Sequence, residues 1–183
     1  ELAEQGVNKI ILLTHYQYEN DLDLARKLSG VDVIIGGDSH TLLGDFAAYG
    51  MNAGGEYPTR VTNADGNTVC VAQAWEYAKV VGELNVQWDS EGNVVACERV
   101  PHLLLDQPTR NDVALTGDAE AEVLAAIDAD PQLSLTAPDA AVQAVLSGYT
   151  QQLDTFRNNV VGMATEDLCL ARIPGVPYGD TTC

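Results

Sequence analysis

Two short apolar runs, with a helix-like stretch between them, constrain the fold of this chain more than any other feature. Residues 8–14 and 31–35 are each largely apolar and of strand length. Asn20 or Asp21 can cap a helix between the two runs, and Gly30 can end it. The apolar face of this helix is supplied by residues at helical spacing, namely Leu22, Leu24, Ala25 and Leu28. The pattern predicts a buried strand, a helix and a second, parallel strand, that is, a β-α-β unit.

Polar residues follow both predicted strands at equivalent positions. His15 comes directly after the first strand, and the second is followed by Gly36, Gly37, Asp38, Ser39 and His40. The carboxyl ends of parallel strands lie at the same edge of a sheet, where α/β proteins place their ligands. Imidazole is the commonest metal ligand in proteins, and glycines let the backbone approach a bound ion closely. The sequence therefore predicts a metal site at this edge.

The middle of the chain is predicted to be all-β after a loop over residues 42–58. Asp-Gly and Glu-Gly turns at residues 63–66 and 89–92 predict two hairpins. The strands are expected at residues 60–62, 68–75, 79–88 and 94–100.

Helices are predicted next, over residues 119–127 and 139–157, and further strands at 160–164 and 168–172. The longer helix has apolar residues along one face, which are expected to pack against the rest of the protein: Val142, Val145, Leu146, Tyr149, Leu153 and Phe156.

The strong negative charge excludes one class of function. Nine basic and twenty-seven acidic residues give a net charge of −18, which repels the backbone of nucleic-acid polymers. If the chain handles phosphate esters, metal ions are the economical source of positive charge. No apolar run approaches the roughly eighteen residues that a membrane span needs.

The four cysteines have neither the spacing of a zinc knuckle nor that of a redox pair. One interpretation is two disulfides in an oxidising compartment, Cys70 with Cys97 and Cys169 with Cys183. The other is four buried free thiols.

Residues 7–43 resemble the closing segment of the catalytic domain of 5′-nucleotidases and UDP-sugar hydrolases, which are calcineurin-like metallophosphoesterases. The family's usual form has a strand ending in His, a short helix, and then a Gly-Gly-His-Ser-His or -Gln turn. Residues 71–82 are similar to the family's Val-Gln-Ala strand pair. The resemblance implies an α+β or α/β fold: half of a four-layer αββα sandwich over residues 1–105, a helical linker over 106–159 and the start of a C-terminal domain over 160–183.

The same resemblance implies two divalent metal ions, of Zn, Mn, Mg or Ca. His15 is then a ligand of the second metal and His40 of the first, while Asp38 stands where the family has His. Either Asp38 still ligates, favouring Mn²⁺ or Mg²⁺ over Zn²⁺, or it falls short and leaves the second site weak or empty. Tyr16 and Tyr18 either line the phosphate end of the site or cover the sheet edge. His102 matches no motif, and we expect a structural or surface role for it.

For the whole protein the resemblance implies hydrolysis of nucleotides or other small phosphate esters by a metal-activated water. The remaining ligands and the catalytic His belong to motifs that are absent from this chain. We expect them in an upstream part of the same polypeptide, so the 183 residues alone should be inactive. By the same resemblance the protein is periplasmic or extracellular. The alternative is a non-catalytic cell-surface binding or scaffold relative whose site is degraded by Asp38.

Overall fold

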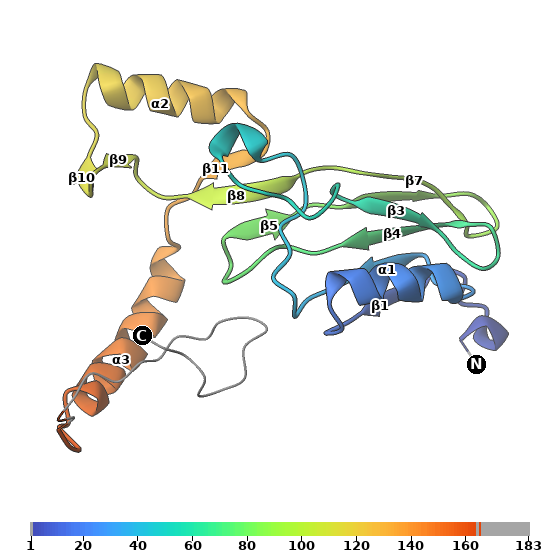
Figure 1. The fold of residues 1–183 in the computed structure, drawn as a ribbon, viewed down its shortest axis with the longest axis horizontal. Coiled ribbons are helices and arrows are strands. Elements are labelled where there is room, and N and C mark those ends of the chain that lie inside the picture. The colour runs from blue at the N-terminus through green and yellow to red at the C-terminus, as the bar shows by residue number, and fades with distance from the viewer. Residues whose placement is uncertain (1, 164, 166–183) are drawn as a thin grey trace. The chain divides into compact units, whose positions relative to one another are not determined.

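The computed structural model describes residues 2–163 and 165 and has a mixed α/β fold (Figure 1). The chain divides into two compact units, one ending at Ala137 and the other beginning at Pro138. The first unit extends past residue 105, because a later strand and helix pack onto it. Within residues 2–163 and 165, none of the helices combines the length and the apolar character that a membrane span requires.

A four-stranded sheet contains the predicted β-α-β unit, and this prediction is confirmed. The strand order is β1-β2-β4-β3, with β1, β2 and β4 parallel and β3 antiparallel to β4. Helix α1 connects β1 to β2, and the predicted turn at residues 63–66 joins β3 to β4. The bounds are β1 Ile11–Leu13, α1 Tyr18–Lys27, β2 Val33–Ile35, β3 Thr59–Thr62 and β4 Thr68–Ala72.

Helix α1 covers one face of this sheet and forms the main core with it. Its Tyr18, Leu22 and Ala25 pack against apolar side chains of the strands, which are Ile34, Val61, Val69 and Val71. The predicted caps of α1 are wrong. The helix begins at Tyr18, whose N–H donates to Ser39 Oγ at 3.0 Å, and Asp21 is buried inside the helix. It ends at Lys27, because Leu28 already has an extended backbone before Gly30 is reached.

Strand β1 is less buried than its apolar sequence predicts. Ile11 and Leu13 are 57% and 76% exposed. Among the described residues β1 has a neighbouring strand on one side only, so it is an edge strand here.

The predicted strand over residues 79–88 is two strands. Its first part, β5, pairs with β8, and its second part, β6, forms a hairpin with β7 across the predicted turn at residues 89–92. The chain changes partner at Gly82 to Asn85, which the apolar pattern does not reveal. Their bounds are β5 Val80–Gly82, β6 Asn85–Trp88, β7 Val94–Glu98 and β8 Pro101–Leu105.

Cys70 of β4 and Cys97 of β7 form a disulfide, as one of the two sequence interpretations has it. Both residues are buried, beside Val33 and Val94, so the bridge joins the four-stranded sheet to the β6–β7 hairpin.

Beyond β8 the structure adds three strands that the sequence analysis did not predict. The two-stranded β9–β10 ladder is antiparallel, and β11 extends the β5–β8 sheet in parallel with β8. The predicted helix at 119–127 is present as α2. The bounds are β9 Thr109–Arg110, β10 Val113–Ala114, α2 Asp118–Ala129 and β11 Leu133–Leu135.

Helix α3 (Ala140–Arg157) confirms the longer predicted helix, and Asp139 caps it by accepting from the N–H groups of Ala141 and Val142. The six large side chains of its apolar face are each at least 51% exposed among the described residues, and the packing of this face stays a prediction. Residues 160–163 do not form the predicted strand. The expected strand at 168–172 and the Cys169–Cys183 pair lie outside the described residues. The described residues also contain two 3₁₀ turns, η1 (Ala3–Gln5) and η2 (Ala47–Tyr49).

Candidate functional site

Two turns lie side by side at the carboxyl edge of β1 and β2. Thr14 N–H donates to Ile35 O at 3.0 Å, which continues the ladder into the turns. The hydrogen bond from Tyr18 N–H to Ser39 Oγ then ties the start of α1 to the second turn. As a result His15 and Asp38 come together, with 3.3 Å between His15 Nε2 and Asp38 Oδ1.

The second turn has an unusual backbone at two predicted ligand positions. Asp38 and His40 have φ angles of 71° and 52°, in the left-handed region that few non-glycine residues adopt. Gly37 before them lies close to the first turn, since a Cβ there would be 3.7 Å from His15 Nδ1. Strained backbone of this kind is concentrated at functional sites, where the surrounding contacts hold it in place.

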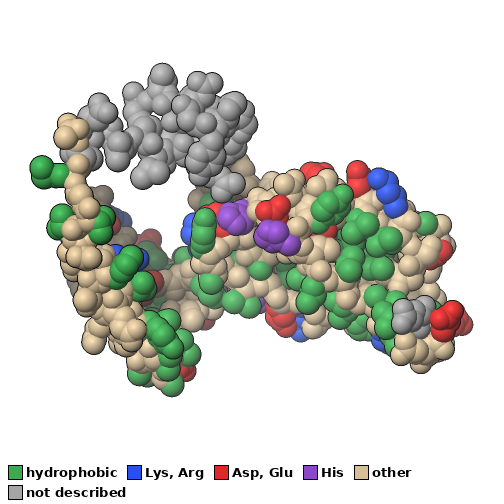
Figure 2. Space-filling view, turned by 90° about the horizontal axis from the view of Figure 1, so that it is seen from below, with side chains coloured by type: hydrophobic (Ala, Val, Ile, Leu, Met, Phe, Trp, Pro, Cys, Tyr) green, Lys and Arg blue, Asp and Glu red, His purple; other side chains and the backbone are tan. Residues whose placement is uncertain are grey.

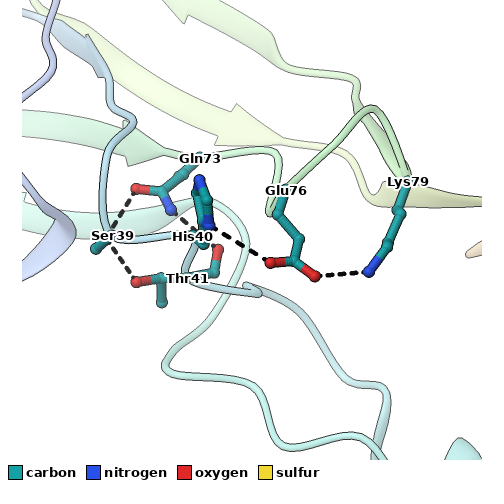
Figure 3. Close-up of polar contacts among 6 residues, drawn as sticks. All are labelled: Ser39, His40, Thr41, Gln73, Glu76 and Lys79. Atoms are coloured by element: carbon teal, nitrogen blue, oxygen red, sulfur yellow. Dashed lines mark hydrogen bonds and ion pairs between the residues drawn. The ribbon is translucent and has the colours of Figure 1, made fainter. Parts of the chain in front are cut away.

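Gln73, at the end of β4, is the contact that holds this turn. The residue is buried, at 3% exposed. In one amide orientation it accepts from Ser39 Oγ and donates to Thr41 O, each at 3.3 Å (Figure 3). In the opposite orientation its oxygen accepts from the N–H groups of His40 and Thr41, and its nitrogen donates to Gly37 O at 3.3 Å. In both amide orientations, this one buried side chain forms hydrogen bonds with the turn.

Asp21 supports the turns from within helix α1. This carboxylate is fully buried and accepts from Thr14 Oγ1 at 2.9 Å, while its Oδ1 has no hydrogen-bond partner. Burial raises the pKa of Asp21, and the Thr14 hydrogen bond only partly opposes this. A side chain at Gly36 would collide with the Asp21 carboxylate, so this glycine is needed for close packing.

Glu76, which was not predicted from the sequence, contacts His40. Glu76 Oε2 lies 3.4 Å from His40 Nδ1, and Glu76 Oε1 pairs with Lys79 Nζ at 2.6 Å (Figure 3). The one sequence signal was its place three residues after Gln73, in the segment that follows a strand of the central sheet.

The two tyrosines predicted beside the site have different surroundings. Tyr18 is 4% exposed, and its hydroxyl shares a 2.6 Å hydrogen bond with Thr59 Oγ1, so it is part of the core. Tyr16 is 54% exposed and remains available to a ligand. His102 lies on β8, 3.3 Å from Glu83 Oε2, and we give it no part in the site.

Each of the two site histidines is paired with one carboxylate. No three His, Cys, Asp or Glu side chains in residues 2–163 and 165 are grouped closely enough to hold a metal ion. The side chains of His15, Asp38 and His40 are 81%, 38% and 48% exposed, and Figure 2 shows histidine and acidic side chains gathered on one face. Imidazole nitrogen together with carboxylate oxygen is a donor set that suits Zn²⁺ and Mn²⁺.

The chain is similar to known nucleotidases along most of its length. It is 33% identical over 174 residues to a probable 5′-nucleotidase of Treponema pallidum, which covers 90% of this chain and 29% of the relative. The NAD 5′-nucleotidase of Haemophilus influenzae is 33% identical over 173 residues, with the same coverage. The solved structure of the Haemophilus influenzae NAD nucleotidase superposes with a TM-score of 0.79 at 33% identity, over 88% of this chain and 34% of that one. No protein-family model matches the chain.

Fold and sequence likeness together point to one class of protein, nucleotidases of mixed α/β structure. The chain belongs to the 5′-nucleotidase family. It spans 29% of the length of each of the two bacterial relatives.

Proposed function

We propose that the whole protein hydrolyses nucleotides, and that this chain contributes His15, Asp38 and His40 to a site for two divalent metal ions. The observation that carries the proposal is the contact between His15 and Asp38, on turns that follow adjacent parallel strands. The names of the relatives supply the substrate class, nucleoside 5′-phosphates and the dinucleotide NAD.

The spacing of His15 and Asp38 fits two ligands of one ion. Donor atoms that each lie about 2.1 Å from an ion, at angles of about 90–110°, are roughly 3.0–3.4 Å apart. His15 Nε2 and Asp38 Oδ1 are 3.3 Å apart. This favours the interpretation in which Asp38 ligates in place of the family's histidine.

Divalent ions, when bound, neutralise phosphoryl oxygens and lower the pKa of a bound water. This chain contributes the metal-binding side chains, which it holds at the carboxyl edge of its sheet. A net charge of −18 would repel a nucleotide anion in the absence of cations. The other ligands and the catalytic His are then supplied by the remainder of the polypeptide, in a complete four-layer sandwich.

We place the protein in the periplasm or outside the cell. The Cys70–Cys97 disulfide supports this, because such bridges persist in oxidising compartments.

The test uses the full-length protein, its bound metal content, and turnover of AMP and NAD. We expect about two divalent ions per chain, and phosphate release that a chelator abolishes and Mn²⁺ restores. His15→Ala and His40→Ala should each lower kcat/KM by roughly 100-fold or more, since even residues behind the ligands are worth about 10–100-fold. His102→Ala is the matched control and should retain activity.

A protein that binds no divalent metal and turns over neither nucleotide would contradict the proposal. That result would favour the non-catalytic scaffold relative. Metal-dependent release of phosphate from other esters, with none from nucleotides, would keep the site and replace the substrate class.

A further inference from the structure

The loop that follows β4 lies beside the turn bearing His40 and presents a carboxylate to it. Gln73 at the start of this loop binds Ser39 and Thr41, so the two segments are joined next to His40 (Figure 3). Glu76, three residues further on, places Oε2 3.4 Å from His40 Nδ1. Neither the family resemblance nor the relatives' names assign a role to this contact.

The ring of His40 is held from two sides. Glu76 lies at Nδ1, and the ring of Tyr77 meets the imidazole edge-on, with centroids 5.2 Å apart and planes at 63°. The backbone of His40 is itself fixed in the left-handed region. A carboxylate at Nδ1 favours the tautomer with its proton on that nitrogen, which leaves the Nε2 lone pair free to bind a cation.

Glu76 is in turn fixed by the loop around it. Its Oε1 pairs with Lys79 Nζ at 2.6 Å, and that ammonium lies 4.7 Å from the ring centroid of Trp75. Trp75, Tyr77 and Ala78 have φ angles of 53°, 47° and 55°, so the backbone on both sides of Glu76 has a conformation that non-glycine residues seldom adopt. The Glu76 side chain is only 22% exposed.

Both carboxylate oxygens of Glu76 are therefore engaged, one by a cation of the chain and one by His40. This arrangement suits a group that orients a ligand better than one that binds the metal itself. Carboxylates placed behind metal-binding histidines commonly have this role, because they fix both the tautomer and the direction of the ring.

We propose that Glu76 is a positioning residue for His40, held by Lys79, which selects the Nδ1-protonated tautomer and so prepares Nε2 as a donor to a divalent cation. The inference rests on the proposed function, because it takes His40 as a metal ligand. It goes further by assigning the selection of the donor atom to Glu76, to which the resemblance gives no role.

The tautomer is tested first, on the metal-free full-length protein, by ¹⁵N NMR of the histidine side chains. His40→Gln assigns the resonances, and the spectra are recorded where imidazole is neutral. We expect the Nδ1–H form of His40 to predominate in the wild type and to lose its predominance in Glu76→Ala. A predominantly Nε2–H form in the wild type, or an unchanged tautomer in the variant, would overturn the proposal whether or not metal binds.

Metal affinity is tested next, by calorimetric titration of the full-length protein with Mn²⁺. Glu76→Ala should weaken the affinity by about 10–100-fold. Glu76→Gln combined with Lys79→Met leaves an amide oxygen free to accept from Nδ1 and should recover most of that loss. The control is Asp23→Ala, which removes an exposed pair with Arg26 of the same three-residue spacing and should change nothing.

The outcomes separate the two proposals. A wild type without Mn²⁺ affinity defeats the proposed function, while the NMR result still stands on its own. A wild type that binds Mn²⁺ as tightly as Glu76→Ala defeats the positioning role alone. A glutamine double variant as weak as Glu76→Ala would make Glu76 a direct ligand and would also overturn the inference. Thermal melting of each variant identifies any that has lost its fold.

Discussion

Gln73 shows how much of this site depends on single buried polar side chains. Its amide binds the turn that bears Asp38 and His40, whichever way the amide is oriented. Gln73→Ala removes the amide and leaves buried backbone groups without partners, so we expect the free energy of unfolding to fall by about 1–3 kcal/mol. Urea unfolding of the variant measures this. Gln151→Ala, on the exposed surface of α3, is the control, and equal stability of the two variants would contradict the prediction.

Asp21 gives a pH-dependent prediction. Burial raises its folded-state pKa above the ordinary 3.8, so folding favours the protonated form. The stability it contributes is fully present below the unfolded-state pKa and is lost as the pH rises through the raised folded-state value. Asp21→Asn cannot ionise, and its stability relative to the wild type should therefore increase from about pH 4 to pH 7. Urea unfolding at both pH values tests this. A difference that is the same at both pH values would refute it.

At the residue scale the sequence could indicate the proposed ligands but not the residues that support them. His15, Asp38 and His40 follow two strands at equivalent positions, a pattern visible in the letters alone. Glu76 reaches His40 because three neighbouring residues have left-handed backbone, and no propensity or spacing rule predicts that for Trp75, Tyr77 and Ala78. Tyr18 was predicted beside the site because it is close to His15 in the sequence. The first turn of α1 instead places its side chain in the core.

At the scale of the elements, the disulfide between β4 and β7 leads to a prediction about the free energy of unfolding. It closes a loop across a sequence separation of 27 residues, for which unfolded-state chain entropy gives about 3.5 kcal/mol of stabilisation. Replacing Cys70 and Cys97 by Ala should lower the free energy of unfolding by about that amount. Urea unfolding under non-reducing conditions measures the loss. A double variant as stable as the wild type would contradict the prediction.

Elements with a strong local signal were predictable, and those defined by their partners were not. Helix α3 has both a helical apolar pattern and an Asp cap, and the hairpin turns have Asp-Gly and Glu-Gly signals. Strands β5 and β6 share one continuous apolar pattern and become separate only because they pair with β8 and β7. Strands β9 to β11 are two or three residues long, too short for any periodicity to show.

At the scale of the whole molecule, the sheet has an apolar face that is open in this chain. Ile11, Leu13 and Ile35 are 57%, 76% and 36% exposed, and Leu13 lies opposite Ile35 in the parallel register. The chain spans 29% of the length of its bacterial relatives. Because a half-open apolar sheet face is costly in water, we expect the remainder of the polypeptide to cover it.

Leu13→Lys tests this arrangement. In the full-length protein the lysine would be placed in a buried contact, and the lost burial of a leucine alone is worth about 1.5–3 kcal/mol. In the 183-residue chain by itself the same substitution should cost little, because Leu13 is already 76% exposed. The measurement is the change in the free energy of unfolding between wild type and Leu13→Lys, made once in the full-length protein and once in the 183-residue chain. The shorter chain is the matched control. Equal effects in both would mean that this face stays open in the whole protein, and would contradict the expectation that the remainder of the polypeptide covers it.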